Sequence, residues 1–377
     1  MIKIVLTNDI VKRISAIDEN RFKMNTIHIP HRIADHLRKI SKKKSSYASN
    51  KIEGNPLSEQ QADEVVEQDP HRHFLKPEQE VRNYYMALQV LEEKAKQNVP
   101  FSKELILEIQ ALVEKGASEE KIGLRGEMPP GFLFAVYDSE SGEAEYIPPE
   151  YCDIPELLDE LVEYVNTTDD HPLIVAAIVH YQLVTIHPFE DGNGRTARLM
   201  SGYVSTQRGY GFHGIGSLEE YFAYDADEYY QSLQMGLPAL YYSGRENPPH
   251  PEIWFDYFLR MVELYSTKVC EISEENETQS LYTSLSHLRP REKEFLAFLL
   301  QNHIYEFTPI DVSKMLGITN RTVINRCTKL AENGFAVPVI VKERIRSYKL
   351  SDYSKLNEQE IQNKIIGGHQ NDRNGTK

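Results

Sequence analysis

The stretch HPFEDGNGRTAR, residues 187–198, decides how the rest of the chain is interpreted. It follows HPLIVAAIVHYQLVTI (171–186), which is apolar nearly all round and therefore predicts a central buried helix. The next segment, TARLMSGYVSTQR (196–208), has the pattern of a second helix that Gly209 ends. The stretch thus predicts a loop between two helices, with its last residues opening the second helix.

Glycines and arginines in this loop favour the binding of phosphate groups. Gly192 and Gly194 permit backbone conformations closed to other residues and let amide groups approach a ligand. Amides at a helix N-terminus attract anions because the helix dipole lies behind them. Arg195 and Arg198 can each donate two parallel hydrogen bonds to phosphate oxygens. This half of the loop therefore predicts an anion site.

The preceding residues supply groups suited to phosphoryl or nucleotidyl transfer. A carboxylate of Glu190 or Asp191, together with phosphate oxygens, is a ligand set that Mg²⁺ accepts. His187 is suited to general-base work, because an unperturbed histidine has a pKa of about 6.5. Each residue alone would more often be a solvated or a core side chain, but the contiguous array favours chemistry on a nucleotide.

The array matches every specified position of HxFx(D/E)GNGRxxR, so the sequence resembles the Fic family. The resemblance implies a mainly α-helical core with a β-hairpin flap. It also implies transfer of AMP from ATP to a Tyr, Thr or Ser hydroxyl of a target protein, with release of pyrophosphate. In this scheme His187 is the catalytic base and Asp191 is the Mg²⁺ ligand. The nucleotide-binding residues implied by the resemblance are Gly192, Asn193, Gly194, Arg195, Arg198, Tyr229 and Tyr230.

A second short pattern lies far upstream. Residues 49–54, SNKIEG, resemble the inhibitory motif (S/T)xxxE(G/N) of the family, with Ser49, Glu53 and Gly54 on its specified positions. The resemblance implies that Glu53 pairs with Arg198 and denies that arginine to the γ-phosphate of ATP. In some relatives the equivalent glutamate orients a water that removes AMP from a modified target, and that alternative activity stays open. An ordinary helix end capped by Gly54 is the plain structural alternative.

Residues 129–149 differ from the helical segments in composition and in hydrophobic pattern. PPGFLFAVYDSESGEAEYIPP carries apolar and aromatic runs on either side of a polar turn, which predicts a β-hairpin. A two-stranded hairpin is marginal alone, so it must pack on helices or serve as a flap. The resemblance implies the flap, whose edge pairs with a segment of the target protein.

Residues 285–350 carry 11 basic and 6 acidic side chains, a net charge of +5, whereas the rest of the chain carries −20. Three helical segments followed by two apolar strands predict a winged helix-turn-helix domain. Such a domain would bind DNA or dock on a protein, and both alternatives stay open. The residues expected to face a DNA groove are Arg321, Asn325, Arg326 and Lys329. A nucleotide-sensing, DNA-binding regulator is therefore the non-enzyme alternative, although a sensor has no need of a catalytic base.

Composition limits the remaining classes of protein. The 377 residues have a net charge of −15, which repels nucleic acid and anionic membranes outside the basic segment. The three cysteines, Cys152, Cys270 and Cys327, lack paired spacing, which argues against a disulfide framework and fits a reducing cytoplasm. No targeting segment or apolar run of spanning length is visible, so we expect a cytoplasmic protein without a membrane partner. A homodimer stays open.

We expect five regions along the chain. They are an N-terminal helical region with the inhibitory helix (1–95), the catalytic core (96–245), a connecting helix or linker (246–284), the winged helix (285–350) and a polar tail (351–377). Helices are expected at 101–115, 154–166, 171–186, 196–208, 217–235 and 251–273.

Overall fold

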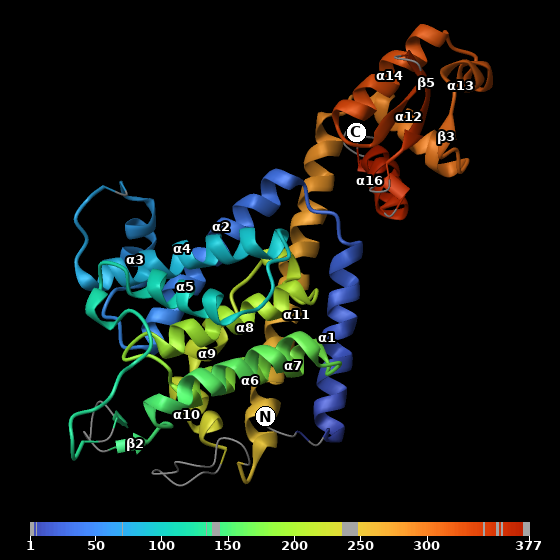
Figure 1. Cartoon of the computed structure of the whole chain (residues 1–377). Coiled ribbons are helices and arrows are strands. Elements are labelled where there is room, and N and C mark those ends of the chain that lie inside the picture. Colours follow the sequence, from blue (N-terminus) through green and yellow to red (C-terminus); the bar gives the residue numbers. More distant parts are fainter. Residues whose placement is uncertain are drawn as a thin grey trace. The chain divides into compact units, whose positions relative to one another are not determined.

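The computed structural model describes residues 4, 6–69, 71–132, 134–137, 144–235, 248–341, 344–351, 354–355 and 357–371. The chain divides into two compact units (Figure 1). The first comprises Met1–Thr26 and His31–Ile272, and the second comprises Ile27–Pro30 and Ser273–Lys377. Among the described residues, no helix combines the length and the apolar character that a bilayer crossing requires.

The first unit is built mainly of helices. They are α1 (Asn8–Thr26), α2 (His31–Ile52), α3 (Glu59–Glu67), α4 (Lys76–Lys96), α5 (Lys103–Glu114), α6 (Ile154–Thr167), α7 (Pro172–Ile186), α8 (Asn193–Gln207), α9 (Glu219–Tyr224), α10 (Ala226–Gln234) and the first part of α11 (Pro251–His287). Three short 3-10 turns join them, η1 (Glu119–Lys121), η2 (Tyr151–Asp153) and η3 (Phe212–Gly214).

α7 is the central helix of this unit, as its sequence predicts. Every side chain from Leu173 to Leu183 is buried. α6 and α8 pack along α7 (Figure 1). From α11, the Trp254 ring lies 4.8 Å from the His180 ring, and its indole N–H donates to the Ala177 carbonyl at 2.9 Å. Because α7 is enclosed, the point at which the 187–198 loop leaves it is fixed.

The helices predicted around the motif are confirmed as α5, α6 and α7, and α8 begins at Asn193, slightly earlier than expected. The helix expected over 217–235 is two helices, α9 and α10. Asp225 separates them, because its carboxylate accepts from the Glu228 amide at 2.9 Å and caps the start of α10. α11 continues past its expected end at residue 273 to His287, so it crosses the boundary between the units.

A short antiparallel pair, β1 (Val136–Tyr137) and β2 (Ala144–Tyr146), lies where the sequence predicts a hairpin. Val136 is opposite Tyr146 in the register. The Tyr146 hydroxyl donates to the Thr185 carbonyl at 2.8 Å, which ties the end of β2 to the last turn of α7. The predicted turn lies outside the described residues, and the role of the hairpin as a flap stays a prediction.

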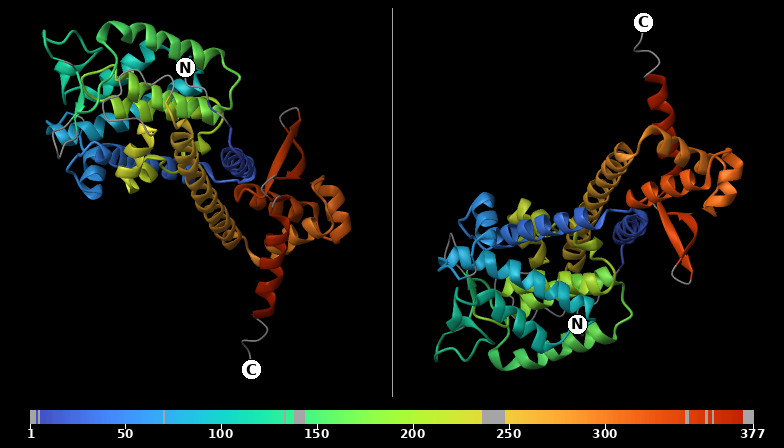
Figure 2. Two further views of the ribbon diagram at one scale, coloured as in Figure 1. Left: turned by 90° about the horizontal axis from the view of Figure 1, so that it is seen from below. Right: turned by 90° about the horizontal axis from the view of Figure 1, so that it is seen from above.

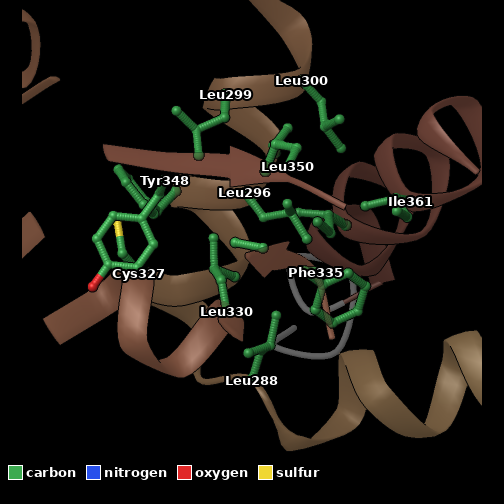
Figure 3. Close-up of a cluster of buried hydrophobic side chains, with 14 of the residues drawn as sticks. Leu288, Leu296, Leu299, Leu300, Cys327, Leu330, Phe335, Tyr348, Leu350 and Ile361 are labelled. Carbon is green, nitrogen blue, oxygen red and sulfur yellow. The ribbon is translucent and has the colours of Figure 1, made fainter. Parts of the chain in front are cut away.

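The second unit places helices around a small sheet. After the last part of α11 come α12 (Pro290–Gln301), β3 (Glu306–Phe307), α13 (Pro309–Leu316), α14 (Asn320–Glu332), β4 (Ala336–Val341), β5 (Arg344–Leu350) and α16 (Glu358–Asn371). The antiparallel sheet has the order β3-β5-β4, and the β4–β5 ribbon projects from the helices (Figure 2). Leu296, Leu330, Phe335 and Leu350 belong to the buried cluster that joins helices and sheet (Figure 3).

The elements of the second unit largely follow the sequence. Its three successive helices and its two longer strands lie where they are expected, and β3 is an addition. The region expected as a polar tail differs, because it holds α16. Ile361 and Ile365, one helical turn apart, join the buried cluster and hold that helix in place. Two apolar residues at this spacing were a weaker signal than the polar composition around them.

Candidate functional site

The loop after α7 begins with an unusual backbone conformation at His187. This residue caps α7 with φ 49° and ψ 58°, in the left-handed region that non-glycine residues seldom adopt. Such a conformation costs on the order of 1–3 kcal/mol and persists only where surrounding contacts impose it. At the other end of the loop, Gly192 has φ 79° and opens α8. The two turns reverse the chain within a few residues.

Residues 121–125, which begin with the last residue of η1, hold this loop in place and are called here the clamp segment. The Arg125 amide donates to the Pro188 carbonyl at 2.9 Å, and its guanidinium donates to the His187 carbonyl at 2.8 Å. Leu124 forms an isolated antiparallel bridge with Phe189, whose ring is completely buried. These contacts over-determine the loop and account for the strained backbone at His187.

The His187 ring is held in one tautomer. Its Nδ1 lies 3.2 Å from the Val184 carbonyl, and since a carbonyl only accepts, Nδ1 carries the proton and Nε2 is left as the basic nitrogen. Burial and, to a smaller extent, the positive charge of Arg125 together lower the pKa of His187 to about 4, against the opposing hydrogen bond to Val184. The ring is therefore neutral near pH 7, which is the form that a general base requires.

Asp191 has a partner on each carboxylate oxygen. Oδ1 accepts from the Gly192 amide at 2.7 Å and from the Arg195 guanidinium at 3.1 Å, while Oδ2 lies 2.9 Å from Lys121 Nζ. Burial alone would raise the pKa of Asp191, but these donors, Lys121 foremost, lower it below its ordinary value. Asp191 is thus held as a carboxylate just before the first turn of α8.

Arg195 differs from the expectation that it forks onto phosphate. Its side chain is 4% exposed and is turned inward, where it donates to Glu114 Oε1 at 2.9 Å. Burial raises the pKa of Glu114 to about 7 despite the neighbouring Arg195. A Cβ on Gly192 would come 2.5 Å from Glu114 Oε1, so glycine is required there for packing as well as for φ. Arg195 therefore stabilises the loop from the protein interior through its contacts with Glu114 and Asp191.

Arg198, three residues further along α8, makes the ion pair predicted with Glu53. Its Nη2 lies 2.6 Å from Glu53 Oε1, its Nε donates to Ser49 Oγ at 2.8 Å, and its Nη2 also donates to the Ser49 carbonyl at 3.0 Å. The Arg198 side chain is 1% exposed, whereas that of Glu53 is 32% exposed. Burial alone would lower the pKa of Arg198, but its pKa is raised above the ordinary value, chiefly because of the negative charge of Glu53. Glu53 follows the last turn of α2, and Gly54 turns the chain with φ 78°.

The Glu53 carboxylate reaches the start of α8. A Cβ built on Gly194 would overlap Glu53 Oε1 and would come 3.2 Å from Arg198 Nη1. Glycine at this position therefore leaves the space in which a negatively charged oxygen lies against the helix N-terminus. In this structure the anion that lies there is a side chain of the same protein.

The two tyrosines of α10 are placed differently from each other. Tyr229 is buried among aromatic rings, with its hydroxyl 2.8 Å from His180 Nε2 and 3.3 Å from Arg198 Nη1. The residue is only 1% exposed and its ring contacts Phe222 and His180, so the structure favours a supporting role over contact with adenine. Tyr230 is 43% exposed, and its hydroxyl donates to the Ile52 carbonyl at 3.2 Å, beside Glu53.

Sequence reasoning missed the second layer of the site. It comprises Gln110, Glu114, Lys121 and Arg125. Gln110 and Glu114 lie one turn apart on α5 and are completely buried. Polar residues at i and i+4 on the apolar face of an amphipathic helix were the available signal. Within the described residues, no group of three or more His, Cys, Asp or Glu side chains could hold a metal ion.

The sequence comparisons with known proteins agree on Fic proteins as the relatives of this chain. A sequence model described as the Fic/DOC family matches residues 100–204. A protein adenylyltransferase Fic from Drosophila mojavensis is 27% identical over 219 residues, which cover 53% of this chain and 38% of that protein. The protein adenylyltransferase fic-1 of Caenorhabditis elegans is 43% identical over 67 residues, 17% of this chain and 13% of that one. The chain thus spans well under half the length of these curated relatives.

Solved structures share the fold. A Fic family protein from Desulfovibrio desulfuricans G20 superposes with a TM-score of 0.58, at 19% identity, over 93% of this chain and 98% of that one. Fic-1 of C. elegans, residues 134–508, superposes with a TM-score of 0.53, at 24% identity, over 72% of this chain and 73% of that one. At these identities the likeness supports the fold alone.

Proposed function

Because the chain carries a Fic/DOC family domain, we propose that it is a protein adenylyltransferase. It transfers AMP from ATP to a Tyr, Thr or Ser hydroxyl of a target protein. The observation that carries this proposal is the pairing of a neutral His187, whose Nδ1 is held by Val184, with an anion site at the start of α8 a few residues later. A base beside a phosphate-binding helix N-terminus is what nucleotidyl transfer to a hydroxyl needs.

The chemical step follows from this arrangement. His187 Nε2 takes the proton of the target hydroxyl as its oxygen attacks the α-phosphorus of ATP. A phosphorus–oxygen bond to the target forms, the bond to the β-phosphate oxygen breaks, and pyrophosphate leaves with the electron pair. Backbone amides at Asn193 and Gly194 and the Arg198 guanidinium bind the phosphates. Asp191 would hold Mg²⁺, which would neutralise charge on the phosphate oxygens.

Glu53 keeps this activity low. Its carboxylate lies against Gly194 and pairs with Arg198, so it holds the guanidinium that the γ-phosphate of ATP would need. The triphosphate then binds only in a displaced position. Removal of AMP from a modified target is the second enzymatic candidate. It is favoured by the same carboxylate, which is partly exposed and whose negative charge acts on His187, so that the two residues could orient a water.

The second unit is proposed to be a winged helix that binds DNA. On α14, Arg321, Asn325 and Lys329 repeat every four residues and are exposed, so they form one polar stripe along the helix. Arg326 is not part of it, because its guanidinium lies over the Phe295 ring at 5.7 Å. In the full chain, Arg321→Ala with Lys329→Ala should weaken duplex binding and lower its salt slope by about 0.9 for each phosphate that is no longer neutralised. An unchanged slope would favour a protein partner.

The experiment that tests the transferase is the loss of the base. We expect His187→Ala to lower AMP incorporation from labelled ATP into lysate proteins by about 10²–10⁴-fold, since general-base catalysis contributes about that much. ATP affinity should stay nearly unchanged, because His187 acts on the target hydroxyl. His36→Ala, exposed on α2, is the control. Equal incorporation by His187→Ala and wild type, measured also with Glu53→Gly in both, would remove His187 from the mechanism.

A further inference from the structure

The clamp segment brings a lysine onto the carboxylate that the site offers to a metal ion. Lys121 Nζ lies 2.9 Å from Asp191 Oδ2, and the other oxygen, Oδ1, is taken by Gly192 and Arg195. Both carboxylate oxygens of Asp191 thus have a partner, and the partner of Oδ2 is a compact ammonium group on a flexible, partly exposed side chain.

This pair is not a random meeting of surface side chains. The Gln110 side chain, completely buried on α5, donates from Nε2 to the Lys121 carbonyl at 3.0 Å and to the Asp191 carbonyl at 3.3 Å. Its Oε1 accepts from the Gly123 amide at 3.0 Å. One buried amide therefore fastens the backbone of both ion-pair partners, and the lysine is delivered to Asp191 by the fold.

The geometry points to Lys121 as an internal cation that occupies the place of the divalent ion on Asp191 until the ion displaces it. We infer that Lys121 is a positioning residue that sets how much divalent ion the protein requires. The inference deepens the proposed function, since it rests on Asp191 as the metal ligand. Displacement is feasible because the Lys121 side chain is 34% exposed and that of Asp191 is 31% exposed, so the ammonium group can move into water.

The electrostatics fix the direction of the effect. A lysine that stays near Asp191 repels a divalent ion, and a lysine that leaves gives up its ion pair, so either way the ion binds less tightly than it would to Asp191 alone. Lys121→Met keeps the length and the apolar part of the side chain, but it removes both the repulsion of the ion and the ion pair that must be given up. Lys121→Arg keeps the charge and therefore keeps them.

The test is Mn²⁺ binding to the full chain, followed by the electron paramagnetic resonance signal of the free ion, without nucleotide. We expect Lys121→Met to bind Mn²⁺ about two- to fivefold more tightly than wild type, which is the range of a partly exposed ion pair. Lys121→Arg should behave like wild type. Lys103→Met, which removes a lysine paired with Asp159 at 2.6 Å, should also leave the binding unchanged.

Two results would overturn the inference. One is equal Mn²⁺ affinity, or equally undetectable binding, in wild type and Lys121→Met. The other is a tighter Lys121→Met site that survives the further change Asp191→Asn, because the ion would then lie elsewhere. Failure of the proposed function is seen separately. If no variant incorporates AMP but Lys121→Met gains an Asp191-dependent site, the lysine inference stands and the transferase does not.

Discussion

Two arginines of the first turns of α8 are held by glutamates, and the two pairs differ in one respect. Arg195 and Arg198 are both almost completely buried, at 4% and 1% side-chain exposure. Glu114, the partner of Arg195, is 0% exposed inside α5, whereas Glu53, the partner of Arg198, is 32% exposed just past the end of α2. The ion-pair distances, 2.9 Å and 2.6 Å, are similar.

The difference in exposure decides what each pair can do. Glu114 cannot leave Arg195 without depriving a buried guanidinium of its main partner, so this pair is part of the framework that supports the Asp191 loop. Glu53 is partly exposed, so another anion could replace its carboxylate beside Arg198. The amide groups at the N-terminus of α8 would then donate hydrogen bonds to phosphate oxygens in its place. We therefore propose that the same kind of ion pair stabilises the structure at Arg195 and controls activity at Arg198.

The largest effect is expected when the buried ion pair between Arg195 and Glu114 is broken. At pH 9, above the pKa of about 7 of Glu114, Glu114→Gln should lower the free energy of unfolding of the first unit by about 3–5 kcal/mol, because Arg195 then remains buried without its main counter-charge. Trp254, the single tryptophan of the chain, is buried in this unit, so its fluorescence in urea follows the unit alone. Glu108→Gln on the same helix removes an exposed pair with Lys94 and should cost at most about 1 kcal/mol. Equal losses would show that burial does not separate the pairs.

A smaller effect is expected at the exchangeable pair. Glu53→Gln should lower the free energy of unfolding by about 1–2 kcal/mol, because Arg198 keeps its hydrogen bonds to Ser49. Mg·ATP at saturating concentration should raise the midpoint of the Trp254 transition more in this variant than in wild type, since bound nucleotide stabilises the folded state. If ATP stabilises wild type and Glu53→Gln equally, then Glu53 does not compete with phosphate for Arg198.

The smallest expected effect is the change in the rate of AMP transfer with pH. It depends on His187, which belongs to neither ion pair. With a pKa of about 4, only about 1% of His187 is protonated at pH 6, whereas about three quarters of an ordinary histidine would be. The rate of AMP transfer by Glu53→Gly at saturating ATP should therefore change by less than about 1.5-fold between pH 8 and pH 6. A fourfold fall over that range would mean that His187 titrates normally. The depressed pKa also means that stability from the neutral ring is lost as pH falls from about 6.5 toward 4.

The two pairs also differ in how far sequence predicted them. Arg198 and Glu53 each lie in a motif with fixed spacing, so their meeting followed from two patterns 145 positions apart. Arg195 was assigned to phosphate by the same motif, yet its direction depends on Glu114, and nothing in a helix sequence tells which buried face meets which loop. The helical core was predictable for the opposite reason, because α5, α6 and α7 are long segments with clear apolar periodicity.

Other differences have similar local causes. The break between α9 and α10 depends on a single capping aspartate, Asp225, which the apolar pattern around it does not reveal. The strand pair β1–β2 was recognised from its turn residues, but its register and its tie to α7 through Tyr146 depend on tertiary contacts. Tyr229 was assigned to adenine by position along the chain, and only the packing of α10 shows its ring enclosed.

AMP incorporation by Glu53→Gly, beside wild type and the double change Glu53→Gly with Arg198→Ala, tests the central claim most directly. The measurement is the initial rate from labelled Mg·ATP into lysate proteins. The account predicts a rise of about 10- to 100-fold in the single variant, because a charge-assisted contact of about 1.5–3 kcal/mol is freed for the γ-phosphate, and loss of that gain in the double variant. A single variant no faster than wild type, or one that instead loses the removal of AMP from a modified target, would contradict it.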